Sequence, residues 1–166
     1  MEELGHLIKL RHEKLADLRE KGIAPYINRF KVDTAIKSLV QDFDGGSKEE
    51  LDEKDHTCIT AGRIMTRRKH GKTTFVNIQD STGKIQVFVN KNVLGEEAYE
   101  LFGKFDIGDI IGINGRVSKT KTGELTLFAS KVTLLSKSLQ PLPEKWHGLK
   151  DVELRYRQRY VDLIVN

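Results

Sequence analysis

Residues 61–90 read AGRIMTRRKHGKTTFVNIQDSTGKIQVFVN, and this stretch decides the fold. It contains two short segments, TTFVNIQ at 73–79 and KIQVFVN at 84–90, in which apolar side chains alternate with other types. Because successive side chains of a strand point to opposite faces, the alternation predicts two strands that each turn one face toward a core. The residues predicted to point inward are Val76, Ile78, Ile85, Val87 and Val89.

The opposite faces of these strands carry aromatic rings and amides, namely Phe75, Asn77, Gln79, Gln86, Phe88 and Asn90. Between Ala61 and Gln79 the sequence has no acidic residue, whereas cations are frequent: Arg63, Arg67, Arg68, Lys69 and Lys72. Aromatic rings interleaved with cations on a sheet indicate binding of single-stranded nucleic acid.

The chain has 166 residues, of which 38% are hydrophobic and 31% charged, so there is room for one main domain with appendages. Its 28 Lys and Arg against 24 Asp and Glu give a formal net charge of +4 and a pI near 9.1. Because this excess is small, the placement of the cations matters more than their number.

Cys58 is the only cysteine, which excludes an internal disulfide or a cysteine-based zinc site and indicates a reducing compartment. The five histidines are too scattered for a metal cluster, so no metal site is predicted. The N-terminus opens with acidic residues, and no long apolar run follows. We therefore expect a cytoplasmic protein without a secretory signal, a transmembrane helix or a membrane partner.

Three helices are predicted before the strands. Apolar residues at helical spacing predict the first over Glu2–Lys21. Asp33 is expected to cap a second helix, whose apolar stripe is Ile36, Leu39, Val40 and Phe43. Ser47 and Glu50 have the spacing of a capping box, so a short third helix is predicted from Ser47 to Lys54.

From Thr57 the period changes to alternation, and five strands are predicted: Cys58–Arg68, Thr73–Gln79, Lys84–Asn90, Ile110–Lys119 and Leu125–Leu135. The connection between the third and fourth contains a helix with its own apolar stripe, Leu94, Ala98, Leu101, Phe102 and Phe105. Three strands, a helix and two strands is the order of the oligonucleotide-binding (OB) barrel, which commonly binds nucleic acid on its second and third strands.

The predicted fold is mainly β, α+β overall, with a five-stranded Greek-key OB-fold barrel. We expect a helical extension over residues 1–56 and the barrel over residues 57–136. Prolines and a lack of periodicity predict a hinge or linker over residues 137–149. Residues 150–166 would begin another domain, with a helix from Asp151 to Val165.

The segment PLPEKWHGLKDVELRYRQRYVDLI, from Pro141 to Ile164, resembles the hinge and first class-defining motif of bacterial-type lysyl-tRNA synthetases, which characteristically read PLPxKxHGLxDxExRYRQRYxDL. The stretches AGRIMTRR, FVNIQD, IQVFV and KTKTGELTL are similar to the anticodon-binding domain of the same class II family. The resemblance covers nearly the whole chain and is weaker toward the N-terminus. Trp146 replaces the phenylalanine usual in the hinge.

The resemblance implies roles for four residues. In this subclass of synthetases, which covers lysine, aspartate and asparagine, the cognate anticodons share a central uridine. Phe75 would stack on that base, Gln86 would hydrogen-bond its edge, and Arg68 would hold the base or its phosphate. Glu124, in the TGEL turn, would contact the neighbouring anticodon base.

Side-chain chemistry agrees with these roles. Stacking contributes about 1–3 kcal/mol for any base, so selection requires hydrogen bonds. A glutamine amide offers a donor and an acceptor to a uracil edge, and the arginine fork can reach a carbonyl or a phosphate. Further cations are expected to attract the phosphates regardless of sequence: Arg63, Arg67, Lys69, Lys72, Arg116, Lys119 and Lys121.

Each of these residues also has a structural alternative. Phe75 would then fill a gap beneath the helices, Gln86 would be an ordinary surface amide, and Glu124 a simple turn residue. Phe88 is expected to pack rather than to bind RNA.

No catalytic residue is predicted, because the sequence lacks paired carboxylates, a nucleophile with a base, and a Gly-rich phosphate loop. In class II synthetases, ATP-dependent activation needs two further motifs, which would lie beyond Asn166. ATP and Mg²⁺ are therefore cofactors of the parent enzyme and not of this chain. We expect an inactive N-terminal portion that binds the anticodon loop of lysine tRNA and is a monomer, whereas the parent enzyme would be a homodimer.

Other functions remain open. A freestanding barrel that binds single-stranded nucleic acid would prefer no anticodon, and a scaffold domain would show no salt-sensitive RNA binding. The chain would also suit an aspartyl or asparaginyl relative as its anticodon domain.

Overall fold

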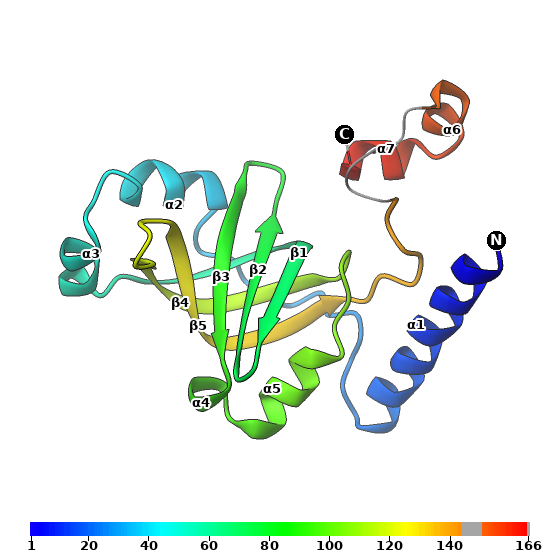
Figure 1. Ribbon diagram of the computed structural model, residues 1–166, viewed down its shortest axis with the longest axis horizontal. Coiled ribbons are helices and arrows are strands. Elements are labelled where there is room, and N and C mark those ends of the chain that lie inside the picture. The colour runs from blue at the N-terminus through cyan, green and yellow to red at the C-terminus, as the bar shows by residue number, and fades with distance from the viewer. Residues whose placement is uncertain (144–150, 166) are drawn as a thin grey trace.

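The computed structural model describes residues 1–143 and 151–165, and its centre is a closed barrel of five strands (Figure 1). The strands are β1 (Thr57–His70), β2 (Thr73–Gln79), β3 (Lys84–Asn90), β4 (Ile110–Lys119) and β5 (Leu125–Ser136). They pair in the order β1-β2-β3-β5-β4, and β4 closes back on β1. The β3–β5 pairing is parallel and the others are antiparallel, so the predicted five-stranded barrel is confirmed.

Seven helices are described around this barrel. They are α1 (Glu2–Glu20), α2 (Ile36–Phe43), α3 (Lys48–Lys54), α4 (Lys91–Leu94), α5 (Glu96–Gly103), α6 (Val152–Arg157) and α7 (Arg159–Val165). In Figure 1, α5 lies at one end of the barrel, α2 and α3 lie toward the other, and α1 stands beside it. The core joins barrel residues with Leu39 of α2 and Phe102 of α5, because these helices cover the open ends.

The predicted alternation in β2 and β3 is confirmed. All five residues expected to point inward are buried. Two hairpin turns use glycine at positive φ, Gly71 at 59° between β1 and β2 and Gly123 at 87° between β4 and β5, a conformation that glycine adopts without steric cost. These turns set the register of the strands that carry the outward-facing side chains.

The segment between α1 and α2 runs along the outside of the barrel. Tyr26 forms a β-bridge with Ser136, and the ring of Phe30 lies against Gly112 of β4. A Cβ atom on Gly112 would lie 2.3 Å from Phe30 Cζ, so only glycine leaves room for this ring. The segment therefore closes over the β4 side of the barrel.

The expected cap of α2 is wrong. Asp33 accepts a hydrogen bond from the Ile59 amide of β1 at 2.9 Å instead, because the carboxylate lies beside that strand. The Ile36 amide at the start of α2 donates to Asp80 Oδ2 at 3.1 Å, so a turn distant in sequence supplies the cap. The capping box of Ser47 and Glu50 is confirmed.

Two predicted helices are each divided. Gly95, at a φ of 92°, separates α4 from α5, so Leu94 and Phe102 belong to different helices, and Phe105 follows α5 in a buried position. Gln158, at a φ of −120° and a ψ of 55°, separates α6 from α7 where one helix was expected. Apolar spacing alone did not show these breaks.

A buried ion cluster fixes the segment that follows β5. Lys137, whose side chain is fully inaccessible, lies 2.9 Å from Asp109 Oδ1 and 2.7 Å from Asp106 Oδ2. From α1, Lys14 also reaches Asp106 at 2.7 Å. Burial would raise the pKa of Asp106, but hydrogen bonds from Lys137 and Lys14 outweigh it and hold that pKa below its ordinary value.

Helix α1 holds the same segment from the outside. Arg11 donates to the main-chain oxygens of Ser138 at 3.2 Å and Ile107 at 3.1 Å. Lys104, just after α5, pairs with Asp17 at 2.7 Å. The first helix therefore connects the end of the barrel with the loop before β4.

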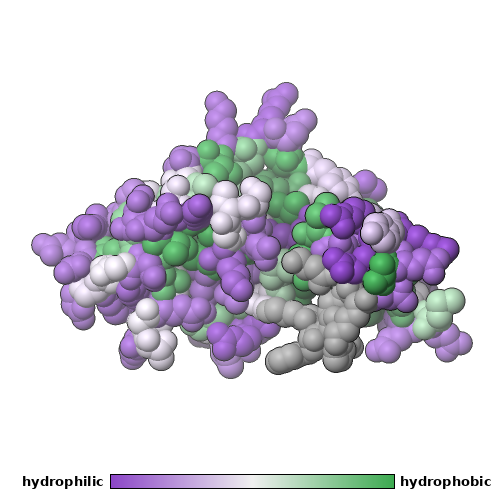
Figure 2. Space-filling model, turned by 90° about the horizontal axis from the view of Figure 1, so that it is seen from above, coloured by the Kyte–Doolittle hydropathy of each residue, from purple (hydrophilic) through white to green (hydrophobic). Residues whose placement is uncertain are grey.

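Polar side chains cover most of the face seen in Figure 2, with apolar side chains showing between them in smaller patches. Among the helices within residues 1–143 and 151–165, none is long and apolar enough to cross a membrane. Residues 144–150, which include Trp146 and the second part of the predicted hinge, lie outside the described residues.

Candidate nucleic-acid interface

Three phenylalanine rings form a row on the outer face of the barrel. Phe75 of β2 is paired in register with Phe88 of β3, and Phe88 with Phe128 of β5. The ring centroids are 5.0 Å apart in the first pair and 5.4 Å in the second. All three side chains are half-buried and lie outside the hydrophobic core. This aromatic row, Phe75, Phe88 and Phe128, offers ring surface to a ligand.

An arginine stands at each end of the aromatic row. The Arg68 guanidinium lies 5.8 Å from the Phe75 ring centroid, and that of Arg116 lies 5.2 Å from the Phe128 centroid. Arg68 of β1 is paired with Phe75, and Arg116 of β4 with Phe128, so the row and its arginines draw one residue from each strand. Cations beside stacked rings suit the negative backbone of a nucleic acid.

Gln86 and Glu124, predicted to contact two different bases, lie against each other. Gln86 Nε2 donates to Glu124 Oε2 at 2.9 Å, and Gln86 Oε1 accepts from the Thr126 hydroxyl at 3.1 Å. The opposite amide orientation would place the Gln86 carbonyl against the carboxylate. Gln86 is 5% exposed because its neighbours cover it, whereas an open surface amide was expected.

Two of the predicted phosphate contacts are engaged inside the fold. Arg67 donates to the main-chain oxygens of Phe102 and Phe105 at the end of α5, and Arg63 donates to the Gly108 oxygen at 2.8 Å. Burial lowers the pKa of both arginines, although arginine stays charged at neutral pH. These guanidinium groups tie β1 to the segment before β4.

The remaining cations lie nearer the solvent. Lys69 stands 5.9 Å from the Tyr99 ring, and Lys119 donates to the Asp44 main-chain oxygen at 2.6 Å. Lys72 and Lys121, in the β1–β2 and β4–β5 turns, are exposed. Each of the two turns therefore carries an exposed lysine beside the strands whose outer faces hold the aromatic row.

The residues that the structure describes provide neither a reactive thiol nor a cluster of metal ligands. Burial, and then the charge of Asp33, raise the pKa of Cys58 to about 11, so the thiol stays protonated at neutral pH. Within the described parts of the chain, no group of three or more His, Cys, Asp and Glu side chains could hold a metal ion. The outer face is suited to binding through stacking and hydrogen bonds.

Sequence reasoning missed Phe128 and assigned Phe88 to packing alone. Both follow the outward alternation of their strands, and Phe88 touches the rings on either side. The signal for Phe128 was its place in LTLFAS, but its meaning depends on the parallel pairing of β5 with β3. That pairing is set by closure of the barrel and not by local sequence.

Comparison with known proteins shows what the domain is similar to. Residues 59–135 match a tRNA anticodon family model described as an OB-fold nucleic acid binding domain. The chain is 54% identical over 165 residues to the lysine–tRNA ligase of Pelotomaculum thermopropionicum, and 53% identical over 165 residues to that of Bacillus cereus strain G9842. Each alignment covers 99% of this chain. The chain carries an anticodon-binding OB domain that is homologous to the N-terminal part of lysine–tRNA ligases.

The chain spans 31% of the first lysine–tRNA ligase and 33% of the second, and corresponds to their N-terminal part. The predicted OB fold and family are therefore confirmed. The family relationship favours an anticodon-binding function over a freestanding barrel of low selectivity or a scaffold domain. In this OB domain the aromatic row lies on β2, β3 and β5, next to the Gln86–Glu124 pair.

Proposed function

We propose that this chain binds the anticodon loop of a lysine tRNA on the outer face of its barrel. Phe75 stacks on the central uridine, and Gln86 hydrogen-bonds the edge of that base. Arg68 holds the base or its phosphate, and Glu124 contacts the neighbouring anticodon base. The observation that carries the proposal is the position of an outward ring, Phe75, beside a guanidinium 5.8 Å from its centroid.

The Gln86–Glu124 hydrogen bond supports a role in selection. An amide nitrogen carries two hydrogens and an amide oxygen two lone pairs. The Gln86 nitrogen donates to Glu124, at 2.9 Å to Oε2 and 3.3 Å to Oε1, and its oxygen accepts from the Thr126 hydroxyl, so both ends of the amide are held in place. An amide held in one orientation offers its donor and acceptor at fixed positions, which suits recognition of a single base edge.

We assign attraction of the phosphates mainly to the cations near the solvent: Arg68, Lys69, Lys72, Arg116, Lys119 and Lys121. The bonds of Arg63 and Arg67 to main-chain oxygens support a structural role for those two side chains. Their charges still add to the positive field around the loop.

We further propose that the chain serves, as part of a longer polypeptide, in ATP-dependent attachment of lysine to its tRNA in the cytoplasm. The residues described here do not suit a Mg²⁺ site, since Asp106 and Asp109 are paired with Lys137. ATP and Mg²⁺ are assigned to the remainder of the enzyme. The chain by itself should be monomeric and should not exchange pyrophosphate with ATP in the presence of lysine.

The test is a titration of the chain with anticodon stem-loops. One loop carries a lysine anticodon, and a second differs only by cytidine at the central position. Tighter binding of the first loop is expected. Equal affinity for the two loops would contradict the proposal and favour a barrel of low selectivity. Aspartate and asparagine stem-loops, which share the central uridine, test whether the outer bases specify lysine.

A further inference from the structure

Helix α3 lies against β4, the strand that carries Arg116. Leu51, which is 1% exposed, anchors this short helix in the core, and the capping box of Ser47 and Glu50 fixes its first turn. Asp52 follows Leu51 directly, and its carboxylate reaches the side chains of β4. The helix therefore presents this carboxylate to the strand from a fixed position.

The Asp52 carboxylate accepts three hydrogen bonds. Its Oδ1 atom accepts from Arg116 Nη1 at 2.8 Å and from the Ser118 hydroxyl, and its Oδ2 atom accepts from Lys48 at 2.6 Å. Arg116 and Ser118 are two residues apart on β4, so their side chains leave the same face of the strand. These bonds, that from Lys48 first, hold the pKa of Asp52 far below its ordinary value, so the carboxylate is charged at neutral pH.

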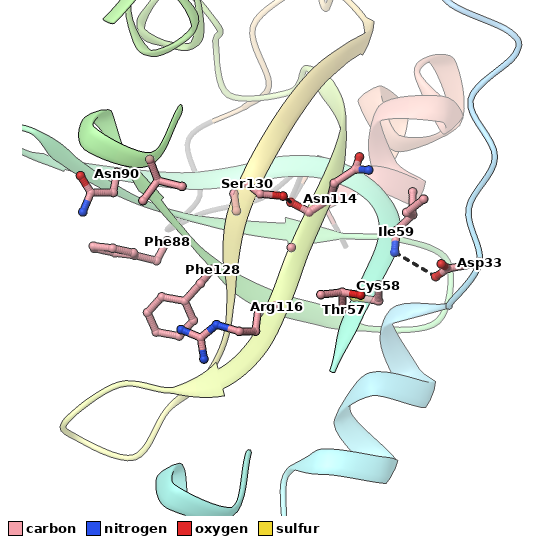
Figure 3. A pocket seen from close by; sticks show the side chains of 13 residues that line it. Asp33, Thr57, Cys58, Ile59, Phe88, Asn90, Asn114, Arg116, Phe128 and Ser130 are labelled. Atoms are coloured by element: carbon pink, nitrogen blue, oxygen red, sulfur yellow. Dashed lines mark hydrogen bonds between the residues drawn. The ribbon is translucent and has the colours of Figure 1, made fainter. Parts of the chain in front are cut away.

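The ion pair with Asp52 determines where the Arg116 guanidinium lies. Figure 3 shows the guanidinium beside the Phe128 ring, and its distance from the ring centroid is 5.2 Å. Asp55, just after α3, places a second carboxylate oxygen 3.9 Å from Arg116 Nε. Arginine has five N–H donors, and the hydrogen bond to Asp52 uses one of them, so donors remain for a phosphate.

An arginine that is held before RNA binds loses less freedom on binding. Immobilising one long side chain at an interface lowers the affinity by about two- to tenfold. Asp52 removes part of this loss, because it holds the guanidinium against Phe128 in the absence of RNA. The Arg116 side chain is still 36% exposed, so a phosphate can reach it.

The charge of Asp52 acts in the opposite direction. A carboxylate repels phosphates, so its removal would by itself strengthen RNA binding. The Asp52 side chain is 36% exposed and is also paired with Lys48, so solvent and this second cation reduce the repulsion. The two effects therefore predict changes of opposite sign when the carboxylate is removed.

We propose that Asp52 is a positioning residue for RNA binding, which acts by holding the Arg116 guanidinium where it meets the phosphates of the bound loop. Asp52 contacts the arginine and not the RNA. The inference deepens the proposed function and rests on it, since Arg116 must contact the RNA. Ser118 contributes to the same arrangement, because its hydroxyl holds the Asp52 carboxylate between α3 and β4.

The test is binding of the lysine anticodon stem-loop, and of the same loop with a central cytidine, at one salt concentration. Asp52→Ala should weaken binding of both loops by about two- to tenfold. The preference between the loops should not change, because a phosphate contact carries no sequence information. In the Arg116→Ala background, Asp52→Ala should have no such effect. The slope of log K against log salt should become shallower in Asp52→Ala, by up to about 0.7, as it should in Arg116→Ala.

Three further variants separate position from charge. Glu53→Ala removes an exposed carboxylate from the next position of the same helix, and it should bind RNA at least as tightly as the unaltered chain. Ser118→Ala changes no charge, and it should weaken binding in the same direction as Asp52→Ala but by less. Asp52→Asn keeps an acceptor oxygen and should also lose less affinity than Asp52→Ala.

Thermal melting establishes that each variant is folded. If Asp52→Ala does not fold, Ser118→Ala, with and without Arg116→Ala, provides the test. Tighter RNA binding by Asp52→Ala, or a loss that persists in the Arg116→Ala background, would overturn the positioning role. A lower melting temperature of Asp52→Ala with unchanged affinity for RNA would assign Asp52 to stability alone and would overturn it equally. Neither result affects the proposed function, which fails instead if the unaltered chain does not prefer the lysine loop to the cytidine loop.

Discussion

Gln86 Nε2 lies 2.9 Å from Glu124 Oε2, so two residues assigned to different bases form one hydrogen-bonded unit before RNA arrives. The Thr126 hydroxyl completes the unit by lying 3.1 Å from the Gln86 amide. Because the turn between β4 and β5 thereby fixes a side chain of β3, recognition of neighbouring bases should be coupled. This coupling and the stability of the barrel can both be measured.

Phe75 and Gln86 should divide affinity and selectivity between them. Phe75→Ala should weaken binding of the uridine and cytidine loops alike by about 1–3 kcal/mol, because stacking does not distinguish them. Gln86→Ala should instead reduce the preference for uridine by about 1 kcal/mol, the usual contribution of one hydrogen bond. Titration of both loops with both variants measures this. An unchanged preference in folded Gln86→Ala would show that Gln86 does not read the base.

Glu124→Ala should also reduce the preference at the central base, because Gln86 loses the partner that orients its amide. Glu124→Gln retains an acceptor and is the matched control, and it should keep most of the preference. In the double variant Gln86→Ala/Glu124→Ala, the loss should be smaller than the sum of the single losses by about 0.5 kcal/mol or more. Strict additivity would indicate that the two side chains act independently.

Binding should weaken as salt rises. If about three to five phosphates are neutralised, the slope of log K against log salt should lie near −2 to −4. Lys72→Gln should make the slope shallower by about 0.7, because one phosphate contact to single-stranded RNA is lost. Lys9→Gln, an exposed change on α1, serves as the control and should leave the slope unaltered. A slope that is flat in the unaltered chain would argue against phosphate contacts.

The free energy of unfolding should fall as the pH drops from about 5 to 2. The pKa of Asp106 in the folded chain is held below its ordinary value, so its stabilising effect is complete above the unfolded pKa and is lost as the carboxylate protonates. Asp106→Asn should be less stable at pH 7 and should show a shallower decline over this range. Denaturant titrations at several pH values measure the decline, with the exposed Asp42→Asn as the control. Equal pH dependence in Asp106→Asn and the unaltered chain would contradict this assignment.

Gly112→Ala should destabilise the chain by about 1–3 kcal/mol, the usual cost of overpacking. The added Cβ would fall 2.3 Å from Phe30 Cζ and displace the ring from β4. The double variant Gly112→Ala/Phe30→Ala should recover part of this loss, which separates the clash from any direct effect on the strand. Thermal or denaturant unfolding provides the measurement, and a stable Gly112→Ala would show that Phe30 has another place to pack.

Local patterns predicted the elements whose causes are local. Alternation placed Val76 and Phe75 on opposite faces of β2, and the spacing of Ser47 and Glu50 predicted the capping box. The prediction that Asp33 caps α2 was wrong because the partner of its carboxylate is the Ile59 amide of β1. This contact forms only when the chain folds, and no local pattern indicates it.

The candidate site was predictable only where a residue faces the solvent on its own strand. Phe75 and Arg68 meet that condition, since β1 and β2 form a hairpin. Gln86 was predicted as a site residue from the resemblance, but its burial against Thr126 was not, and neither was the place of Phe128, because both depend on the parallel pairing of β3 with β5. A count of charges likewise could not show that Arg67 is bound to main-chain oxygens at the end of α5.

Because of Arg11 and Lys137, the chain does not become free of the barrel where β5 ends. With Lys137 buried and Ser138 bonded to Arg11, the polypeptide is held to the barrel past its last strand. Helix α1 therefore holds this segment rigidly against the barrel. A force applied to the chain after Ser138 would move the barrel and α1 together. Substitutions in α1 would then change the direction in which the chain leaves the barrel. They would not change the residues proposed to contact the bases, so the two properties can vary independently.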